Sequence, residues 1–289
     1  MFAVRFVRVA VILGLVLIAG CVATGPVLSG SGQRGMPTRV DLEQTPFFPQ
    51  VEHQCGPSGL ATVLSASGLP VAPADLVPEV YLPERRGSLQ PELLASARRR
   101  DRLPYVLPPT SDAIVSQLDA GIPVLVLQKL GAGPWPGWHY AVVVGYDVEA
   151  QVFLLRSGTE RRLEMPVARF LATWDRADRW AIVVLQPGQM PGAPDAGRYI
   201  EAAAALEAVG HIDAAGIAYQ AAAAQWPWDA LPRLALGNAA LTRGDLAAAE
   251  SDYRQAVALD RTNVAARNNL AEVLLRRGCM SAARSEIVI

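Results

Sequence analysis

The stretch that decides the fold of the first half of the chain runs from Gln50 to Leu64 and reads QVEHQCGPSGLATVL. After Cys55, small and apolar residues recur at helical spacing, namely Gly59, Leu60, Val63 and Leu64. Pro57 suits the first turn of a helix, where a missing N–H removes no hydrogen bond. The sequence therefore predicts a helix that begins at Cys55 and places its thiol beside free backbone N–H groups.

A cysteine in this position has a chemical consequence. The partial positive charge at a helix N-terminus favours the thiolate over the thiol and makes the sulfur a better nucleophile. We therefore expect Cys55 to be an activated thiolate with a pKa well below the ordinary value. A buried structural cysteine is the alternative, because free cysteines are commonly buried.

Histidine candidates for a partner come from three places in the chain. Residues 122–130 predict a buried strand, His139 opens a second apolar strand, and Val152–Leu155 predicts a third. A histidine at the mouth of a strand can be aimed rigidly at a thiol carried by a helix, and cysteine before histidine is the papain-like order. His53, two residues before Cys55, is a competing candidate for the base, although a neighbour so close in sequence is poorly placed to reach the sulfur in line; His211 lies in a turn of the C-terminal half. His139 is therefore the predicted base.

Several motifs together resemble a known family. Gln50, the Cys55-Gly56-Pro57 run and the Trp138-His139-Tyr140 run are similar to the bacteriocin-processing (double-glycine leader) peptidases, and in particular to lipoproteins of that group with tetratricopeptide repeats. The resemblance covers roughly residues 45–186. It implies a papain-like fold with Cys55 as nucleophile, His139 as general base and then acid, and an upstream glutamine as oxyanion donor. Gln50 is our first choice for that donor and Gln54 the second.

One member of the family's site is replaced in this sequence. In the processing peptidases an Asp after the next strand orients the imidazole, whereas here residues 154–158 read LLRSG and hold no carboxylate. Ser157 can accept a hydrogen bond from the ring, but it cannot stabilise an imidazolium as an anion would. We expect either a Cys–His dyad with Ser157 as a neutral orienter or a weakened site.

The C-terminal part repeats with a period of 34 residues. Four columns share this interval: Gly210, Gly244 and Gly278; Ala215, Ala249 and Ala283; Tyr219, Tyr253 and Ile287; Ala222 and Ala256. Small residues at a helix crossing, glycine at a turn and an aromatic residue in the second helix are typical of tetratricopeptide repeats. We predict repeats at 196–229, 230–263 and 264–289, the last incomplete, that recruit a protein partner. Plain helical packing without a partner is the alternative.

The N-terminus has the layout of a lipoprotein signal peptide. Arg5 and Arg8 precede an apolar run, residues 9–19, which is too short to span a bilayer and ends at Gly20-Cys21. We predict a signal peptide over 1–20, a lipidated Cys21, a flexible tether over 21–40, and anchoring at the periplasmic face of the outer membrane. An uncleaved single-pass anchor is the alternative.

Composition excludes other classes of protein. Of 289 residues, 51% are hydrophobic and the formal net charge is −1, so the chain has neither the composition of a disordered protein nor the basic field of a nucleic-acid binder. The sequence shows no metal-ligand cluster and no cofactor fingerprint, so we expect neither metal nor cofactor. The basic run Arg98–Arg100 with Arg102 is interpreted as a solvated helix face. Cys55 and Cys279 lie in different predicted domains and are expected to stay unpaired.

The predicted architecture is an α+β papain-like cysteine peptidase domain (41–186), a Pro/Gly linker (187–195) and an all-α tetratricopeptide-repeat domain. The predicted function is a membrane-anchored, periplasmic cysteine peptidase that acts on a peptide or protein. Two alternatives stay open at this point: an inactive binding module that holds a peptide tail, and an acyl or peptidyl transferase that uses the same site.

Overall fold

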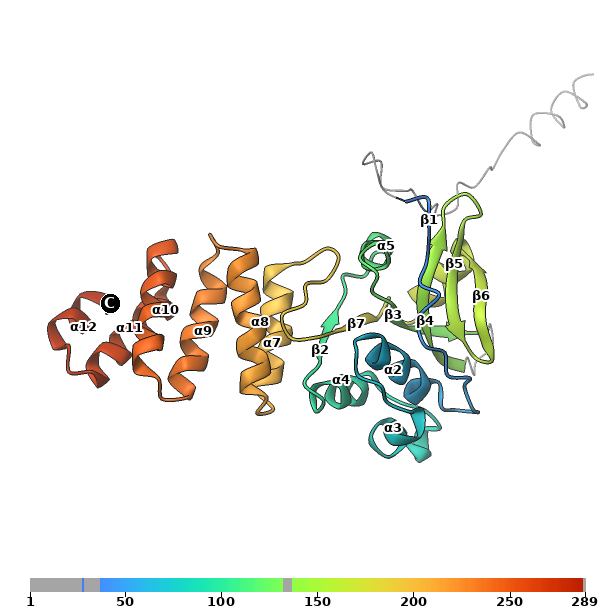
Figure 1. Cartoon of the computed structure of the whole chain (residues 1–289), viewed down its shortest axis with the longest axis horizontal. Helices are drawn as coiled ribbons and strands as arrows, with labels where there is room; N and C mark the ends of the chain where they lie inside the picture. The colour runs from blue at the N-terminus through green and yellow to red at the C-terminus, as the bar shows by residue number, and fades with distance from the viewer. Residues whose placement is uncertain (1–27, 29–36, 132–136, 288–289) are drawn as a thin grey trace, which may run out of the picture.

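The structure is a computed structural model and describes residue 28 and residues 37–131 and 137–287 (Figure 1). It confirms the expected order of a mixed α/β domain followed by an all-helical region. Within the described ranges, no helix combines the length and the apolar character needed to cross a membrane. The predicted signal peptide and the lipid site at Cys21 lie outside the described residues.

One antiparallel sheet organises the α/β domain. Its order is β2-β7-β3-β4-β5-β6, and β1 pairs with the end of β4. The strands are β1 (Arg39–Asp41), β2 (Leu103–Val106), β3 (Val124–Leu130), β4 (Gly137–Asp147), β5 (Val152–Ser157), β6 (Glu160–Pro166) and β7 (Ala181–Leu185). The strands predicted near residues 122–130, 139–147 and 152–155 correspond to β3, β4 and β5.

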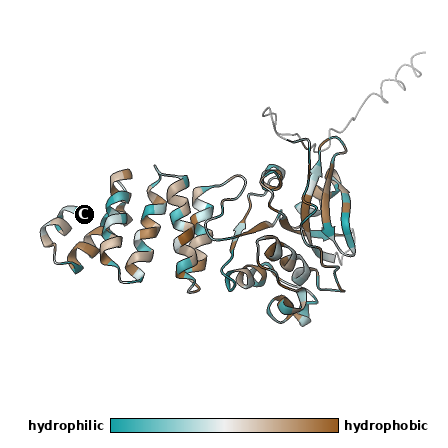
Figure 2. Cartoon of the chain, viewed as in Figure 1, coloured by the Kyte–Doolittle hydropathy of each residue, from teal (hydrophilic) through white to brown (hydrophobic). Residues whose placement is uncertain are grey.

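Helices cover both faces of this sheet. The helices of the domain are α2 (Cys55–Ala66), α3 (Pro73–Val80), the short 3₁₀ helix η1 (Pro83–Arg85), α4 (Gln90–Arg98), α5 (Ser111–Asp119) and α6 (Val167–Asp175). Alternate residues of β3 face opposite sides: Leu125 and Leu127 pack with α2, α3 and α4, while Val124 and Val126 pack with α5 and α6. Figure 2 shows the hydrophobic stretches on strands and helices that form these two cores.

The segment before residue 41 is partly packed, which corrects the prediction of a flexible tether through residue 40. Leu28 is buried, and its backbone N–H and C=O bond the side chain of Gln151 at 2.9 and 3.0 Å. Val40, in β1, pairs with β4 opposite Tyr146. The buried guanidinium of Arg156 fixes the next residues, because it donates to the carbonyls of residues 43 and 45 at 3.1 and 3.3 Å.

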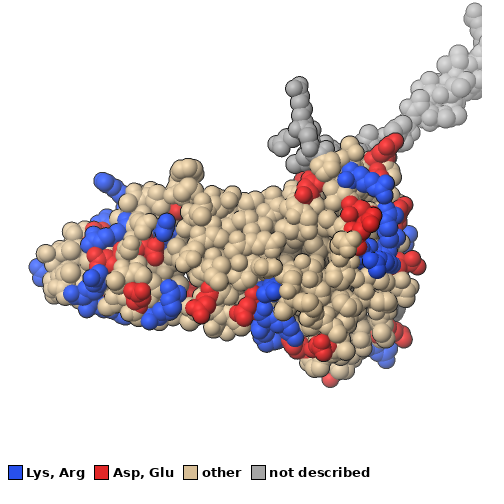
Figure 3. All heavy atoms as spheres, viewed as in Figure 1, with Lys and Arg blue, Asp and Glu red and all other residues tan. Residues whose placement is uncertain are grey.

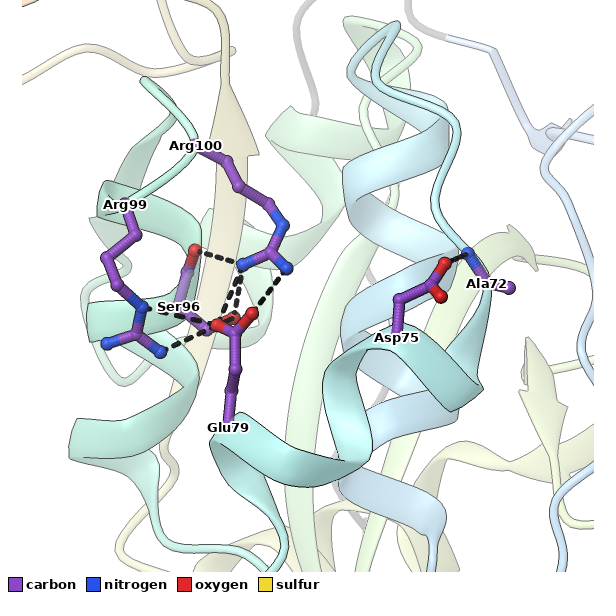
Figure 4. Close-up of polar contacts among 6 residues, drawn as sticks. All are labelled: Ala72, Asp75, Glu79, Ser96, Arg99 and Arg100. Atoms are coloured by element: carbon purple, nitrogen blue, oxygen red, sulfur yellow. Dashed lines mark hydrogen bonds and ion pairs between the residues drawn. The ribbon is translucent and has the colours of Figure 1, made fainter.

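The basic run is also different from the prediction of a solvated face. Glu79 of α3 accepts hydrogen bonds from Arg99 and Arg100 at 2.7 and 2.6 Å and from Ser96 at 2.9 Å (Figure 4). These bonds, chiefly the one from Arg100, lower the pKa of Glu79 to about 2. Arg102 bonds the hydroxyl of Ser67 at 3.0 Å. The run therefore joins α3 and α4 to the end of α2, and sequence periodicity alone does not show the acidic partner.

Six helices follow in pairs: α7 (Ala196–Glu207), α8 (Ile212–Gln225), α9 (Ala230–Thr242), α10 (Leu246–Leu259), α11 (Val264–Arg276) and α12 (Met280–Glu286). The first helices of successive pairs start 34 residues apart, and so do the second helices. The glycine column (Gly210, Gly244, Gly278) has φ of 91°, 77° and 79°, a left-handed conformation that glycine adopts without strain. The alanine column (Ala215, Ala249, Ala283) is fully buried.

The first helical pair packs directly on the α/β domain. Helix α7 contacts β2, and one hydrophobic cluster continues from the sheet through α7 and α8 into α9. His211 at the start of α8 lies 2.7 Å from Asp101 of the α/β domain. On the face shown in Figure 3, the upper middle of the molecule carries few charged side chains, and charged groups gather along its lower edge.

Gly145 gives a direct test of how β1 is held. A Cβ at this position would lie 2.2 Å from the carbonyl oxygen of Val40, so Gly145→Ala must push β1 away from β4. We expect a loss of about 1–3 kcal/mol in the free energy of unfolding. Gly216, inside α8 and free of close contacts, is the matched control: Gly216→Ala should stabilise by about 0.5–1 kcal/mol. Chemical denaturation measures both, and equal stability of the two variants would contradict the close approach.

Candidate functional site

Helix α2 begins at Cys55, as predicted, and two glycines bring it unusually close to its neighbours. A Cβ on Gly56 would lie 2.3 Å from Ser88 Oγ, and one on Gly59 would lie 2.8 Å from Leu125 Cδ1. Any larger residue at these positions would move the start of the helix away from the sheet and from the loop at Ser88. Glycine therefore fixes the position of the Cys55 thiol.

Cys55 opens into a cavity of about 870 Å³ between α2, the loop before α4 and the start of β4. This cavity brings together three predicted site residues, Gln50, Cys55 and His139, from three separate segments. The rest of its lining is Val51, Glu52, His53, Arg85, Arg86, Gly87, Ser88, Leu89, Gln90, Leu127, Gly137, Trp138, Tyr140 and Gly158. A space of this size holds several residues of an extended peptide.

Ser157 lies at the position that the sequence assigns to a possible orienter. His139 Nε2 and Ser157 Oγ are 2.8 Å apart, across the paired strands β4 and β5. Among the described residues, Ser157 is the only hydrogen-bond partner of the imidazole, and no carboxylate reaches the ring. The Nδ1 atom is therefore left for a thiol or a substrate. Asp147, at the end of β4, instead accepts from the N–H of Ala150 in the following turn.

The electrostatics of the pair differ from the prediction of a preformed thiolate. Burial raises the pKa of the Cys55 thiol, although the backbone N–H groups of Tyr140, Gly56 and Cys55 itself act in the opposite direction. Burial lowers the pKa of His139. Both shifts favour neutral groups, because desolvation penalises each charged form. The prediction of an activated thiolate is wrong for this resting state: the cost of burying the charge exceeds the benefit of the helix N-terminus.

Gln50 is held from both ends of its amide. Its Nε2 donates to the carbonyl of Tyr140 at 3.1 Å, and its Oε1 accepts from the N–H of Gly158 at 3.0 Å. The second N–H of the amide makes no hydrogen bond with a described residue, and Gln50 lines the cavity. Gln54, the second choice for the oxyanion donor, precedes α2 and is not among the described residues that line the cavity.

The remaining histidines have other contacts. His53 lines the cavity, has a left-handed backbone (φ 63°), and lies 3.4 Å from the carboxylate of its neighbour Glu52. His211 is far from the cavity, in the turn before α8 as expected. Cys279 is exposed and, like Cys55, unpaired. No group of three or more His, Cys, Asp or Glu side chains suited to a metal occurs in the described part of the chain.

The sequence does not predict the loop that forms one wall of the cavity. Arg85 ends η1 and Arg86 and Ser88 follow it, in a stretch with no motif except Gly87. The sequence also predicts no structural role for Tyr140, which follows His139. Its hydroxyl donates to the carbonyl of Ser88 at 3.3 Å, so it holds this loop in place.

Comparison with known proteins agrees with the geometry. Residues 42–182 match the model of the Peptidase_C39 like family, a range that includes β2 to β6 and both candidate catalytic residues. This match supports a papain-like, C39-type cysteine peptidase fold for the α/β domain. No curated protein matches the chain.

Three solved structures are similar to parts of the chain, each at low sequence identity. A putative C39-like peptidase from Bacillus anthracis is 17% identical over 51% of this chain and 98% of its own, with a TM-score of 0.42. The peptidase domain of Streptococcus ComA, a bifunctional ABC transporter involved in a quorum-sensing pathway, is 18% identical over 50% and 99%, with a TM-score of 0.39. The Yersinia enterocolitica type III secretion translocator chaperone SycD is 22% identical over 32% and 69%, with a TM-score of 0.30.

The protonation state of Cys55 can be measured directly. Because burial raises its pKa, alkylation by iodoacetamide should increase with pH and have its midpoint above the ordinary thiol value of about 8.5. Mass spectrometry of the peptide that contains Cys55 measures the rate at each pH, with the exposed Cys279 of the same sample as the control. A midpoint well below 8.5 that rises in His139→Ala would contradict the neutral resting pair.

Proposed function

We propose that this protein is a cysteine peptidase that cleaves a peptide or protein at Cys55. The observation that carries the proposal is the cavity in which a helix N-terminal cysteine, a strand-borne histidine and a fixed glutamine amide meet. The match of residues 42–182 to a peptidase family supports the same reaction class.

In the proposed reaction, the neutral His139 takes the thiol proton of Cys55 as the sulfur attacks the carbonyl carbon of the scissile bond. The resulting oxyanion accepts hydrogen bonds from the backbone N–H of Cys55 and from the free N–H of Gln50. The imidazolium then gives its proton to the leaving amine and a thioester remains. Water attacks the thioester, with His139 again as the base, and releases the acid and the thiol. Ser157 holds the ring in the orientation that both proton transfers need.

A second function fits one observation. The hydrogen-bond partner of His139 is the neutral Ser157, so the imidazolium that forms during catalysis lacks an anionic neighbour. A site of this kind can hold a peptide without cleaving it at a useful rate. The experiment that separates the two functions is incubation of the full chain, purified in detergent, with a library of random decapeptides. Products seen by mass spectrometry with the unmodified chain, and absent with Cys55→Ser, support the peptidase. Their absence favours the binding module.

The role of Ser157 as a positioning residue gives a kinetic prediction. Ser157→Ala removes one hydrogen bond of about 1 kcal/mol and should lower kcat by about fivefold. In the unmodified chain, the acidic limb of the kcat/KM profile should lie below the ordinary histidine value of about 6.5, because burial lowers the pKa of His139 and only its neutral form acts as a base. Ser157→Asp places an anion beside the ring, stabilises the imidazolium and should shift this limb to higher pH. An acidic limb that stays at the same pH in both variants would show that Ser157 does not act through His139.

We propose further that the chain is a lipoprotein of the bacterial envelope, with lipid on Cys21 and the folded part at the periplasmic face of the outer membrane. The sequence of residues 5–21 supports this proposal. Growth with labelled palmitate should label the protein, and Cys21→Ala should abolish the label. Label retained in Cys21→Ala would contradict lipidation at this site.

The helical region is proposed to be a tetratricopeptide array that recruits a protein partner. Helices that start at intervals of 34 residues support this proposal, as do the left-handed glycines at each turn. The packing inside the second pair has the expected close approach, because a Cβ on Gly237 of α9 would lie 2.5 Å from the ring of Tyr253 of α10.

A further inference from the structure

The loop between η1 and α4 forms one wall of the cavity, and the proposed reaction leaves its side chains unused. Arg85, Arg86 and Ser88 all lie on this wall. The loop touches the reacting end of α2 directly, since Ser88 Oγ is 2.3 Å from the place where a Cβ on Gly56 would be. A peptide bound at Cys55 must therefore lie along this loop.

Backbone bonds fix the shape of the loop before any substrate enters. The N–H of Leu82 donates to the carbonyl of Gly87 at 2.8 Å, and the reciprocal bond is 3.4 Å long. Arg86 sits at the tip with a left-handed backbone (φ 47°), which costs energy for a residue other than glycine. Strained conformations of this kind are retained where the surrounding structure holds them, and they concentrate at ligand sites.

Ser88 holds this wall against the start of α2. Its hydroxyl oxygen is shielded from solvent, packs against Gly56 and has no hydrogen-bond partner among the described residues. Ser88 therefore fixes the position of the wall, and the side chains that the wall offers to a substrate are those of Arg85 and Arg86.

The two arginine side chains on this wall are not paired. Arg85 and Arg86 are exposed, and neither guanidinium group forms a hydrogen bond or ion pair with another described residue. Arg99 and Arg100, a short distance along the chain, are both bound by Glu79.

Three acidic residues lie in the neighbourhood of the cavity. Glu52 lines it, but its side chain is 86% exposed and contacts His53. Glu84 is exposed on η1 and makes no ion pair with a described residue. Glu92 of α4 acts on the charge of Tyr140, and one of its carboxylate oxygens is buried without a hydrogen-bond partner among the described residues.

We propose that this loop selects the substrate, and that it favours peptides with an acidic side chain, Asp or Glu, beside the scissile bond. The guanidinium groups of Arg85 and Arg86 bind the carboxylate. Arginine is suited to this role, since its planar group pairs with a carboxylate through two parallel hydrogen bonds. The inference rests on the proposed function of the cavity as a peptide site.

The test uses binding, so that it does not depend on catalysis. The full chain carrying Cys55→Ala is purified in detergent, immobilised and exposed to the random decapeptide library, and the retained peptides are sequenced by mass spectrometry. We expect Asp and Glu to be enriched over Asn and Gln by about three- to tenfold, as for a partly exposed charged pair. The enrichment should shrink at 0.5 M salt, because screening weakens exposed pairs. It should disappear in the Arg85→Gln, Arg86→Gln double variant.

Arg169→Gln is the matched control, since this arginine is exposed on α6 at the opposite face of the sheet and lines no part of the cavity. Enrichment of acidic residues that is absent, or that persists in the double variant, would overturn the inference. The inference of an acidic preference and the proposed peptidase function can be rejected separately. Cleavage of the library by the unmodified chain without acidic preference rejects only the inference, whereas acidic enrichment without cleavage rejects only the peptidase.

Discussion

The whole site depends on how closely α2 lies against the sheet. Gly59 lets the helix reach Leu125 of β3, and Gly56 lets its first turn reach Ser88, where even one methyl group would force a separation. This close approach puts the thiol of Cys55 near the backbone of Tyr140, one residue after His139. It also buries the thiol. The same packing that brings Cys55 and His139 into one cavity therefore raises the cost of ionising the thiol, and burial favours the neutral form of both groups.

Because Cys55 and His139 are neutral at rest, the charges that the proposed reaction needs must form during the reaction itself. A preformed thiolate and imidazolium would be costly here because both groups are buried, and among the described residues no carboxylate contacts the ring to stabilise its charge further. In the proposed mechanism charge appears only as the proton moves, when the developing oxyanion and the imidazolium stabilise each other. Ser157 is adequate for a histidine that spends most of its time uncharged, and its position at the end of β5, beside a register shift between β5 and β6, aims its hydroxyl at the ring.

Much of this could be predicted from the sequence, for definite physical reasons. Helical spacing after Cys55, the apolar strands and the 34-residue period are local or periodic patterns, and the helices and strands that they predict are present. The cavity also brings together Gln50, Cys55 and His139, as the order of the motifs predicts. The protonation state of Cys55 could not be predicted, because burial depends on the packing of distant segments. The partner of Arg99 and Arg100 was missed because Glu79 lies on another helix, and the loop at Arg85–Ser88 carries no periodic pattern.

One hydrophobic cluster runs without a break from the sheet into α7, α8 and α9. The helical region is thus packed onto the α/β domain through a shared hydrophobic core. The contact of His211 with Asp101 adds a polar interaction at the same junction. Because the two regions share this core, the distance between the helical region and the cavity is fixed. A polypeptide that touched both would meet Cys55 at a fixed distance along its own chain, so that length, in addition to local sequence, would decide which bond reaches the sulfur. Such tethering also raises the effective concentration of that bond without a single extra contact in the cleft.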